Sequence, residues 1–316
     1  MAIRDLRELR LLDAEAGEEA VFLKGRPPMG EFLGFVRHQS LGGSAVDLTA
    51  LSDEWRAAND HVQQLELSEA GLADDPSIED LPDTLDSKRA EFVSNPVVKQ
   101  SFAVVPFDVR LVEIDRLVVF QKVINLDHVR RIKTRLGPSP SQAELFDACL
   151  PLGNDGTSVV GHQIANNAWV FVSPSNDLRV LDTTVLHPDQ VLEHTWSGFP
   201  ASIVGFAIGF GVNALSAIQV GRRLVLNNGS HRAYALREMG ISKVPCLIQR
   251  VSRRDELEVV ANEQLVKNAD YFLTAPRPPL LKDYFDNDLR TIVRVPKRAR
   301  QLKLVVASES LDTPLA

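Results

Sequence analysis

Residues 213–251 decide the fold: NALSAIQVGRRLVLNNGSHRAYALREMGISKVPCLIQRV. Two apolar runs, at 215–220 and 223–226, flank a glycine-containing turn, and this pattern predicts a β-hairpin. The alanine-rich run 233–239 predicts a helix that ends at a glycine, and residues 244–251 predict a further strand. The order of hairpin, helix and strand therefore predicts a mixed α/β fold.

A polar loop, Asn227 to Arg232, joins the hairpin to the helix. The first N–H groups of a helix lack partners within it, and together they favour anions. Gly229 lets the backbone approach a phosphate closely, and Ser230 and His231 can donate hydrogen bonds to it. The alternative interpretation is a helix start whose polar side chains only satisfy nearby backbone groups.

The segment 201–252 resembles the ParB/sulfiredoxin superfamily, in which a hairpin leads into a glycine-containing loop at a helix start. The matching residues are Leu226 to Arg232, the helix, and the turn Gly240 to Pro245. Residues 103–136 also resemble the opening strand, loop and first helix of that fold. The resemblance implies an α/β (α+β) fold with a ParB/sulfiredoxin-like core.

The resemblance also implies a site for the phosphates of a nucleoside triphosphate or diphosphate such as ATP or CTP, with Mg²⁺ as an accompanying ion. The residues that would hold the phosphates are Asn228, Gly229, Ser230, His231 and Arg232. Sulfiredoxins need a cysteine where this chain has Ser230, so sulfinate reduction is not expected. Kinase-like and defence-type members often carry an aspartate where this chain has Asn228, which removes one carboxylate base. His231 is a candidate for proton transfer.

Three further candidates lie in the upstream block. Glu113 and Asp115 belong to the predicted opening strand, and in the resembling fold this edge faces the phosphate loop, where a carboxylate can position a metal ion or a water. Lys122 precedes a helix predicted over 126–136 with Asn125 as its N-cap, and a lysine there can reach a phosphate. The alternative is that all three are solvated surface charges.

Composition narrows the class of protein. The chain has 316 residues, 44% hydrophobic and 24% charged, with a net charge of -7, which is typical of a globular protein and not of a basic nucleic-acid coat protein. The two cysteines form no zinc or disulfide pattern, and the first residues lack the apolar core of a signal peptide, so a cytoplasmic location is expected. The apolar run 199–212 is too short to span a membrane, and we expect a buried strand there.

Three parts are expected along the chain. Residues 1–98 form a helical N-terminal extension, in which Asp47 caps a helix from residue 48. Within it, residues 69–87 contain seven acids and no lysine or arginine, which indicates a solvated acidic linker or, alternatively, a docking segment. Residues 99–262 form the ParB-like core, and residues 263–316 form a basic tail.

An insertion is expected within the core at 137–200, largely as a β-meander. Three histidines lie in it, but their spacing matches no metal-binding motif, so no metal site is expected: His162, His187 and His194. The tail is basic and strand-like over 290–303. It is interpreted either as a charged edge strand or as a contact for DNA or a protein partner.

The leading functional hypothesis is a ParB-like nucleotide-binding protein that acts in a DNA-associated, defence or partition-type system. Hydrolysis of the nucleotide, or transfer of its phosphoryl group, is the activity considered for it. The alternatives are a non-catalytic interaction module and a DNA-binding accessory factor with the same fold. The sequence leaves open which nucleotide is bound and what the oligomeric state is.

Overall fold

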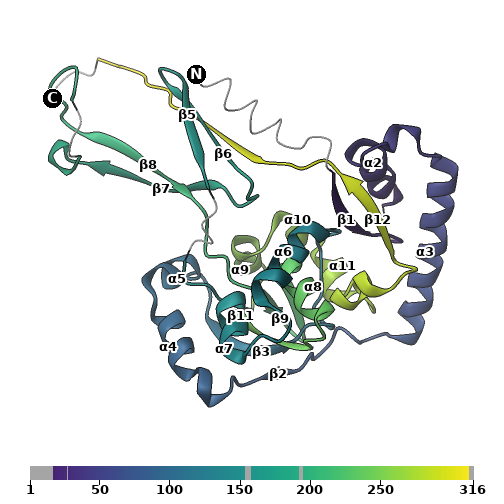
Figure 1. Ribbon diagram of the computed structural model, residues 1–316. Coiled ribbons are helices and arrows are strands. Elements are labelled where there is room, and N and C mark those ends of the chain that lie inside the picture. Colours follow the sequence, from purple (N-terminus) through teal and green to yellow (C-terminus); the bar gives the residue numbers. More distant parts are fainter. Residues whose placement is uncertain (1–16, 27, 154–157, 192–194, 313–316) are drawn as a thin grey trace. The chain divides into compact units, whose positions relative to one another are not determined.

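The computed structural model of this chain describes residues 17–26, 28–153, 158–191 and 195–312. These residues form a mixed α+β protein that divides into two compact units (Figure 1). Within the described residues, the core unit comprises 17–153 and 212–297, and the insert unit comprises 158–211 and 298–312. This division differs from the three parts expected, because residues 137–153 belong to the core unit and the tail is shared between both units.

A five-stranded sheet forms the centre of the core unit. Its strand order is β10 (Arg223–Asn228), β9 (Ser216–Val220), β11 (Lys243–Val251), β3 (Phe107–Glu113) and β2 (Ile78–Glu79). Strands β9 and β11 are parallel, and the other pairs are antiparallel. The predicted hairpin is confirmed as β9 and β10, and the predicted last strand as β11.

Helices α8 (Ser230–Glu238), α6 (Leu126–Leu136) and α7 (Gln142–Cys149) pack with this sheet around one apolar core. Leu215, Leu236 and Leu247 are fully buried there and come from the loop before β9, from α8 and from β11. The predicted N-cap of α6 is confirmed, since the Asn125 side chain accepts a hydrogen bond from the His128 N–H at 2.8 Å.

The N-terminal extension contains a strand that the sequence analysis missed. β1 (Glu18–Leu23) is the central strand of a second sheet, between β4 (Val123–Asn125) and β12 (Arg290–Val295). Its partners are about a hundred or more residues away, so no local hairpin signal marks it. The predicted helix after Asp47 is confirmed as α3 (Leu48–Ser68), whose Thr49 N–H donates to the Asp47 carboxylate.

The remaining short elements complete the core unit. They are α2 (Met29–Gln39), η1 (Gly43–Ala45), η2 (Asp83–Leu85), α4 (Asp86–Ser94), α5 (Pro96–Ser101), α9 (Arg254–Val260), α10 (Glu263–Lys267), α11 (Ala269–Thr274) and η4 (Leu281–Phe285). Within the described ranges, no helix is both long and apolar enough to cross a membrane.

The acidic stretch 69–87 is folded onto the core unit and is not a solvated linker. Asp74 accepts a hydrogen bond from the Arg223 Nε at 2.7 Å, and Asp75 pairs in the same way with Arg222 at 2.7 Å. Glu79 belongs to β2 and pairs with the first lysine of β11. The acids of this stretch therefore neutralise cations of the central sheet, which a count of like charges along the sequence does not reveal.

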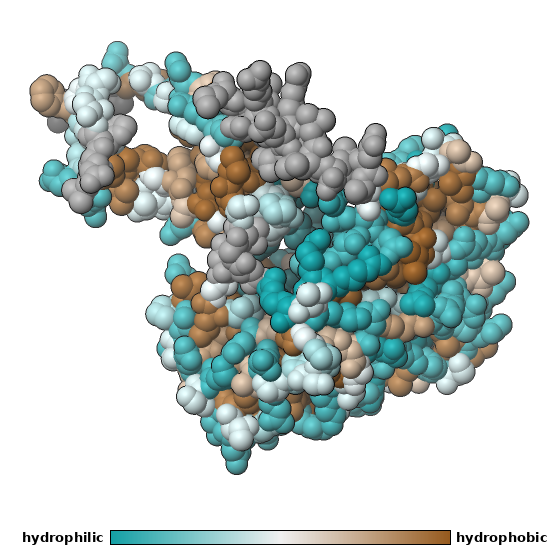
Figure 2. Space-filling view, in the orientation of Figure 1, coloured by the Kyte–Doolittle hydropathy of each residue, from teal (hydrophilic) through white to brown (hydrophobic). Residues whose placement is uncertain are grey.

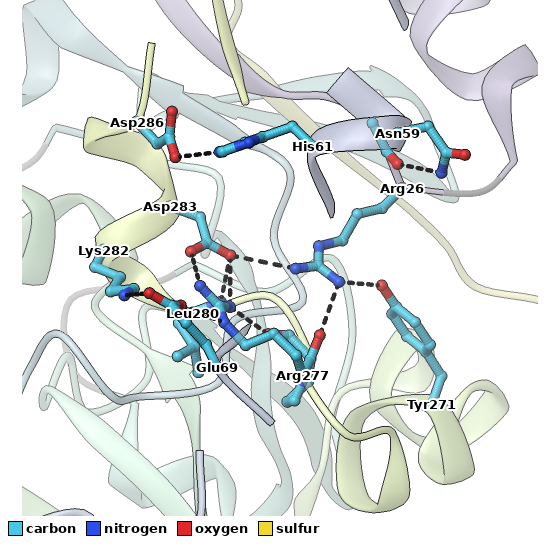
Figure 3. Close-up of polar contacts among 12 residues, drawn as sticks. Arg26, Asn59, His61, Glu69, Tyr271, Arg277, Leu280, Lys282, Asp283 and Asp286 are labelled. Carbon is cyan, nitrogen blue, oxygen red and sulfur yellow. Dashed lines mark hydrogen bonds and ion pairs between the residues drawn. The ribbon is translucent and has the colours of Figure 1, made fainter. Parts of the chain in front are cut away.

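A buried ion network joins the N-terminal and C-terminal segments of the core unit (Figure 3). The guanidinium of Arg277, 0% exposed, donates to both carboxylate oxygens of Asp283, 1% exposed, at 3.0 and 2.5 Å. Arg26, which follows β1, donates to the same carboxylate at 3.4 Å and to the Tyr271 hydroxyl at 3.1 Å. Glu69, at the end of α3, accepts from the Arg277 Nε at 2.9 Å.

The insert unit consists of two small sheets. One has the order β13 (Arg300–Val305), β6 (Ala168–Ser173) and β5 (Val160–Ala165), and the other is the hairpin of β7 (Arg179–Leu186) and β8 (Ile203–Gly209). A short helix, η3 (Pro188–Gln190), follows β7. The expected meander is therefore two separate hairpins, one of which takes a strand from the tail.

The apolar run 199–212 contains β8, but it is not the buried strand that was expected. Val204 is 62% exposed, and its partner on β7, Val185, is exposed as well. Phe199, which precedes β8, is also exposed. Hydrophobic surface is visible in the area of this hairpin in Figure 2. The expectation was wrong because β7 and β8 form only a two-stranded sheet, which cannot bury the side chains of its own strands.

The buried network gives a stability prediction. Asp283→Asn removes the negative charge that neutralises two buried arginines, and breaking such a pair costs about 3–5 kcal/mol of unfolding free energy. The matched control is Asp147→Asn, which breaks an exposed pair with Lys88 and costs less than about 1 kcal/mol. Urea denaturation monitored by circular dichroism measures both losses. Equal, small losses would show that the buried network is not needed for stability.

Candidate phosphate-binding site

The loop between β10 and α8 is built around one glycine. Gly229 has a φ of 94°, in the left-handed region, and is the N-cap of α8. A Cβ at this position would lie 3.1 Å from the Cα of Leu215 and 3.2 Å from its Cγ. Both the backbone conformation and the close packing therefore require glycine here.

The first N–H groups of α8 have no side-chain cap within the described part of the chain and can donate hydrogen bonds to a ligand. Gly229 has no side chain to cap the helix, and no side chain of the described residues caps it. The first hydrogen bond of the helix runs from the Ala233 N–H to the Gly229 carbonyl at 2.8 Å. The N–H groups of Ser230 and His231 precede this bond, so the positive end of the helix dipole lies at this loop.

Arg232 holds the protein's own backbone, which differs from the phosphate contact expected for it. Its side chain is buried, and the residue is 8% exposed. One terminal nitrogen donates to the Cys149 carbonyl at 2.7 Å, and the other donates to the Asn213 carbonyl at 2.9 Å and to its side-chain oxygen at 3.0 Å. Cys149 and Asn213 lie just outside the two ends of the inserted segment. Arg232 therefore fixes the chain where it leaves the core unit and where it returns.

Asn228 and Ser230 complete the loop. The Asn228 side chain is exposed and donates to the Ala214 carbonyl at 3.0 Å, so it supports the loop without contributing charge. Ser230 is buried at the first position of α8. The structure thus brings Asn228, Gly229 and Ser230 together, as the sequence predicted for neighbours in one loop.

Two histidines lie side by side at this end of the core unit. The rings of His231 on α8 and His128 on α6 are perpendicular, with their centroids 5.2 Å apart. Burial, together with the charges of His128 and Arg131, lowers the pKa of His231 to about 4. His231 is therefore neutral at pH 7 and can donate one ring N–H, while an anion between these residues would favour its protonated form.

The carboxylates expected to face the loop do not lie beside it. Asp115 accepts from the Arg237 Nε at 2.9 Å, and Arg237 is in the last turn of α8, about 12 Å along the helix from Gly229 at 1.5 Å per residue. Glu113 accepts from the Ser77 N–H at 3.4 Å and lies 3.7 Å from Arg116. Both carboxylates thus neutralise cations at the other end of α8 or on the sheet edge.

Lys122 is also occupied elsewhere. Its ammonium group pairs with Glu31 on α2, and its backbone carbonyl accepts from the Leu23 N–H at 2.8 Å. His128 and Arg131 were not among the predicted site residues, and they lie three positions apart on the predicted helix 126–136. That i, i+3 spacing was a usable signal for one basic helix face, but only the packing of α6 on α8 brings the face to the loop.

The histidines of the insert unit show no shared site within the described residues. His187 pairs with Asp189 at 3.0 Å and is exposed, and His162 lies on β5. His194 falls outside the described residues. The basic tail is divided. Arg290, Arg294 and Lys297 belong to the core unit, and Arg298, Arg300 and Lys303 belong to the insert unit.

No protein-family model matches this chain, and neither a curated protein nor a solved structure matches it significantly. A function for the α8 loop therefore has to be inferred from the geometry and charge of its own residues.

His231 gives a prediction about pH. Its pKa is about 4 in the folded chain and about 6.5 in the unfolded chain, so the unfolded chain binds the extra proton as the pH falls from 6.5 to 4. Stability should therefore fall over that window, by up to about 2.5 kcal/mol at pH 4.5. Comparing the unfolding free energies of wild type and His231→Gln at pH 7 and pH 4.5 isolates this contribution. An equal pH dependence in the two proteins would contradict it.

Proposed function

We propose that this protein is a phosphate-binding module that takes a nucleotide of the ATP or CTP type at the start of α8. The observation that carries the proposal is the uncapped N-terminus of α8 at the left-handed Gly229, with His231 and His128 beside it. Backbone N–H groups and a helix dipole together attract phosphate. Arg131, on the same face of α6 as His128, adds positive charge, and its guanidinium also lies 3.6 Å from the Glu18 carboxylate.

We propose a ParB/sulfiredoxin-like core as the framework of this site. Support comes from the order of β9, β10, α8 and β11, in which the loop after a hairpin opens a helix and the next strand returns parallel to β9. The strand β3 and the helix α6 supply the upstream block of the resemblance. The phosphate loop of that superfamily then corresponds to Asn227 to Arg232.

The proposed module binds the nucleotide without hydrolysing it. Hydrolysis needs a group that activates a water or holds a metal ion next to the phosphates. Glu113 and Asp115 are engaged with cations away from the loop, and Asn228 offers no carboxylate. Mg²⁺ would then arrive bound to the nucleotide phosphates and not to carboxylates of this loop.

Nucleotide binding is tested by thermal shift with ATP, ADP, CTP, GTP and inorganic phosphate, each with and without Mg²⁺. A nucleotide at 100 times its dissociation constant adds about 2.7 kcal/mol to the free energy of unfolding. Arg131→Gln and His231→Gln should each weaken binding several-fold, since each removes a donor or a charge near the phosphates.

The matched control for these variants is Lys133→Gln, two residues from Arg131 on α6, whose lysine pairs with Glu238 at 2.6 Å near the other end of α8. This variant should bind like wild type. Arg232 is not a suitable test residue, because its substitution removes hydrogen bonds that hold the backbone. If neither nucleotide nor phosphate shifts the melting temperature, the proposal is wrong, and phosphate release from ATP or CTP would contradict binding without hydrolysis.

We propose a nucleic-acid contact on the tail as a second function. Arg298, Arg300 and Lys303 are exposed on or beside β13, and none of them is in an ion pair with a described residue. Cations on an edge strand also protect it from pairing with other strands, which is the competing explanation. Such a contact would be made to phosphates and would show little sequence preference.

Salt dependence tests this second function. Three phosphate contacts give a slope of about -2.7 for the logarithm of duplex affinity against the logarithm of salt concentration. Replacing Arg298, Arg300 and Lys303 together by glutamine should flatten that slope toward zero, while Arg253→Gln with Arg254→Gln in the core unit should leave it unchanged. Fluorescence anisotropy with a labelled duplex at low and moderate salt gives the slopes. Absence of binding at low salt would leave edge protection as the role of these cations.

A further inference from the structure

His61, Asp286 and Asp288 form a cluster that is separate from the α8 loop. His61 lies on α3, and the two aspartates lie in the turn after η4. Asp286 is 225 residues from His61 in the sequence. One potential ligand atom from each residue lies within 4.8 Å of the other two. The His61 Nε2 and an Asp286 carboxylate oxygen are 2.9 Å apart and point toward each other (Figure 3).

We propose that these three residues bind a divalent transition-metal ion such as Zn²⁺, Mn²⁺ or Co²⁺. One imidazole nitrogen with two carboxylate oxygens is a donor set that favours such ions over Ca²⁺, which prefers oxygen alone. Two ligands about 2.1 Å from a metal and at right angles to each other are about 3.0 Å apart. The separation of His61 and Asp286 suits this arrangement, with the metal ion taking the place of the direct contact between the two groups.

A pocket next to the cluster leaves room for the remaining ligands of the metal ion. Asp286 lines this pocket of about 290 Å³, together with Leu65 of α3 and Glu69, the residue that follows α3. His61, Leu65 and Glu69 are four residues apart in turn, so they lie along one face of the helix. Lys282 and Arg237 also line the pocket. Both cations are paired, Lys282 with Glu69 and Arg237 with Asp115, so we expect water in this pocket to complete the coordination.

The protein positions the aspartates before any metal ion arrives. The Asp286 N–H donates to the carbonyl of the buried Asp283 at 3.2 Å, and the Asp288 N–H donates to the other Asp286 carboxylate oxygen at 2.9 Å. His61 is fixed by the long helix α3. Histidine spacing along the chain predicted no metal site, because these ligands are far apart in the sequence and meet only in the fold.

The test is a titration of the full chain, freed of metal by dialysis against a chelator, with Co²⁺ followed by visible absorbance. Zn²⁺ and Mn²⁺ are followed by calorimetry. We expect one metal ion per chain and a rise in melting temperature. Asp288→Asn and His61→Gln should each lower the affinity at least about 10-fold. Asp288 is exposed, so its variant should keep the fold, which the melting temperature without metal verifies.

The matched control is His187→Gln, which removes an exposed histidine that also pairs with an aspartate, Asp189, but belongs to no such cluster within the described residues. This variant should keep the affinity and stoichiometry of wild type. No saturable binding in wild type, equal affinity in Asp288→Asn, or tighter binding of Mg²⁺ or Ca²⁺ than of Co²⁺ would each overturn the proposal. These outcomes are independent of nucleotide binding at α8, because the two sites share no residue.

Discussion

The buried pair of Arg277 and Asp283 is the interaction on which the core unit depends most. Both groups are almost fully removed from water, so neither can stay charged at low cost without the other. Because Arg26 and Glu69 bind the same pair, the segment from Arg277 to η4, the strand β1 and the end of α3 have to come together at once. This constraint explains how β1 and β12, about 270 residues apart in the sequence, become neighbours in one sheet. It also determines where the turn with Asp286 lies.

Charge pairing over long distances recurs throughout the core unit. The acids of residues 69–87 neutralise arginines and a lysine of the central sheet, and Asp115 neutralises Arg237, whose guanidinium lies 4.1 Å from the centre of the Phe285 ring. Arg232 belongs to the same pattern, although its partners are backbone carbonyls. Several charged residues that the sequence suggested as site residues, such as Asp115 and Arg232, instead stabilise the fold. The groups proposed to bind an anion are the backbone N–H groups of the α8 loop, the histidine pair and Arg131.

The sequence was informative where structure is local. The hairpin of β9 and β10, the caps at Asp47 and Asn125, and the helix after Gly229 follow from turns, caps and periodicity within about twenty residues. β1 and β13 could not be predicted in the same way, since each pairs with a strand far away in the chain. Asp115 lies near the last turn of α8 because the end of β3 packs there. The periodicity of apolar residues does not predict which end of a helix a strand approaches. His61 and Asp286 are likewise related only through the packing of α3 against the C-terminal part of the core unit.

The fixed ends of the inserted segment have a consequence for how this chain can vary. The Leu215 N–H donates to the Cys149 carbonyl at 2.7 Å, and Arg232 holds the carbonyls of both Cys149 and Asn213, so the chain leaves and re-enters the core unit at neighbouring points. Closing a longer loop between fixed ends costs only about 0.6 kcal/mol for each doubling of its length. The gap between Gly153 and Val212 is therefore a position where evolution can lengthen, shorten or exchange whole domains, and where a reporter domain can be grafted, while the core unit keeps its architecture.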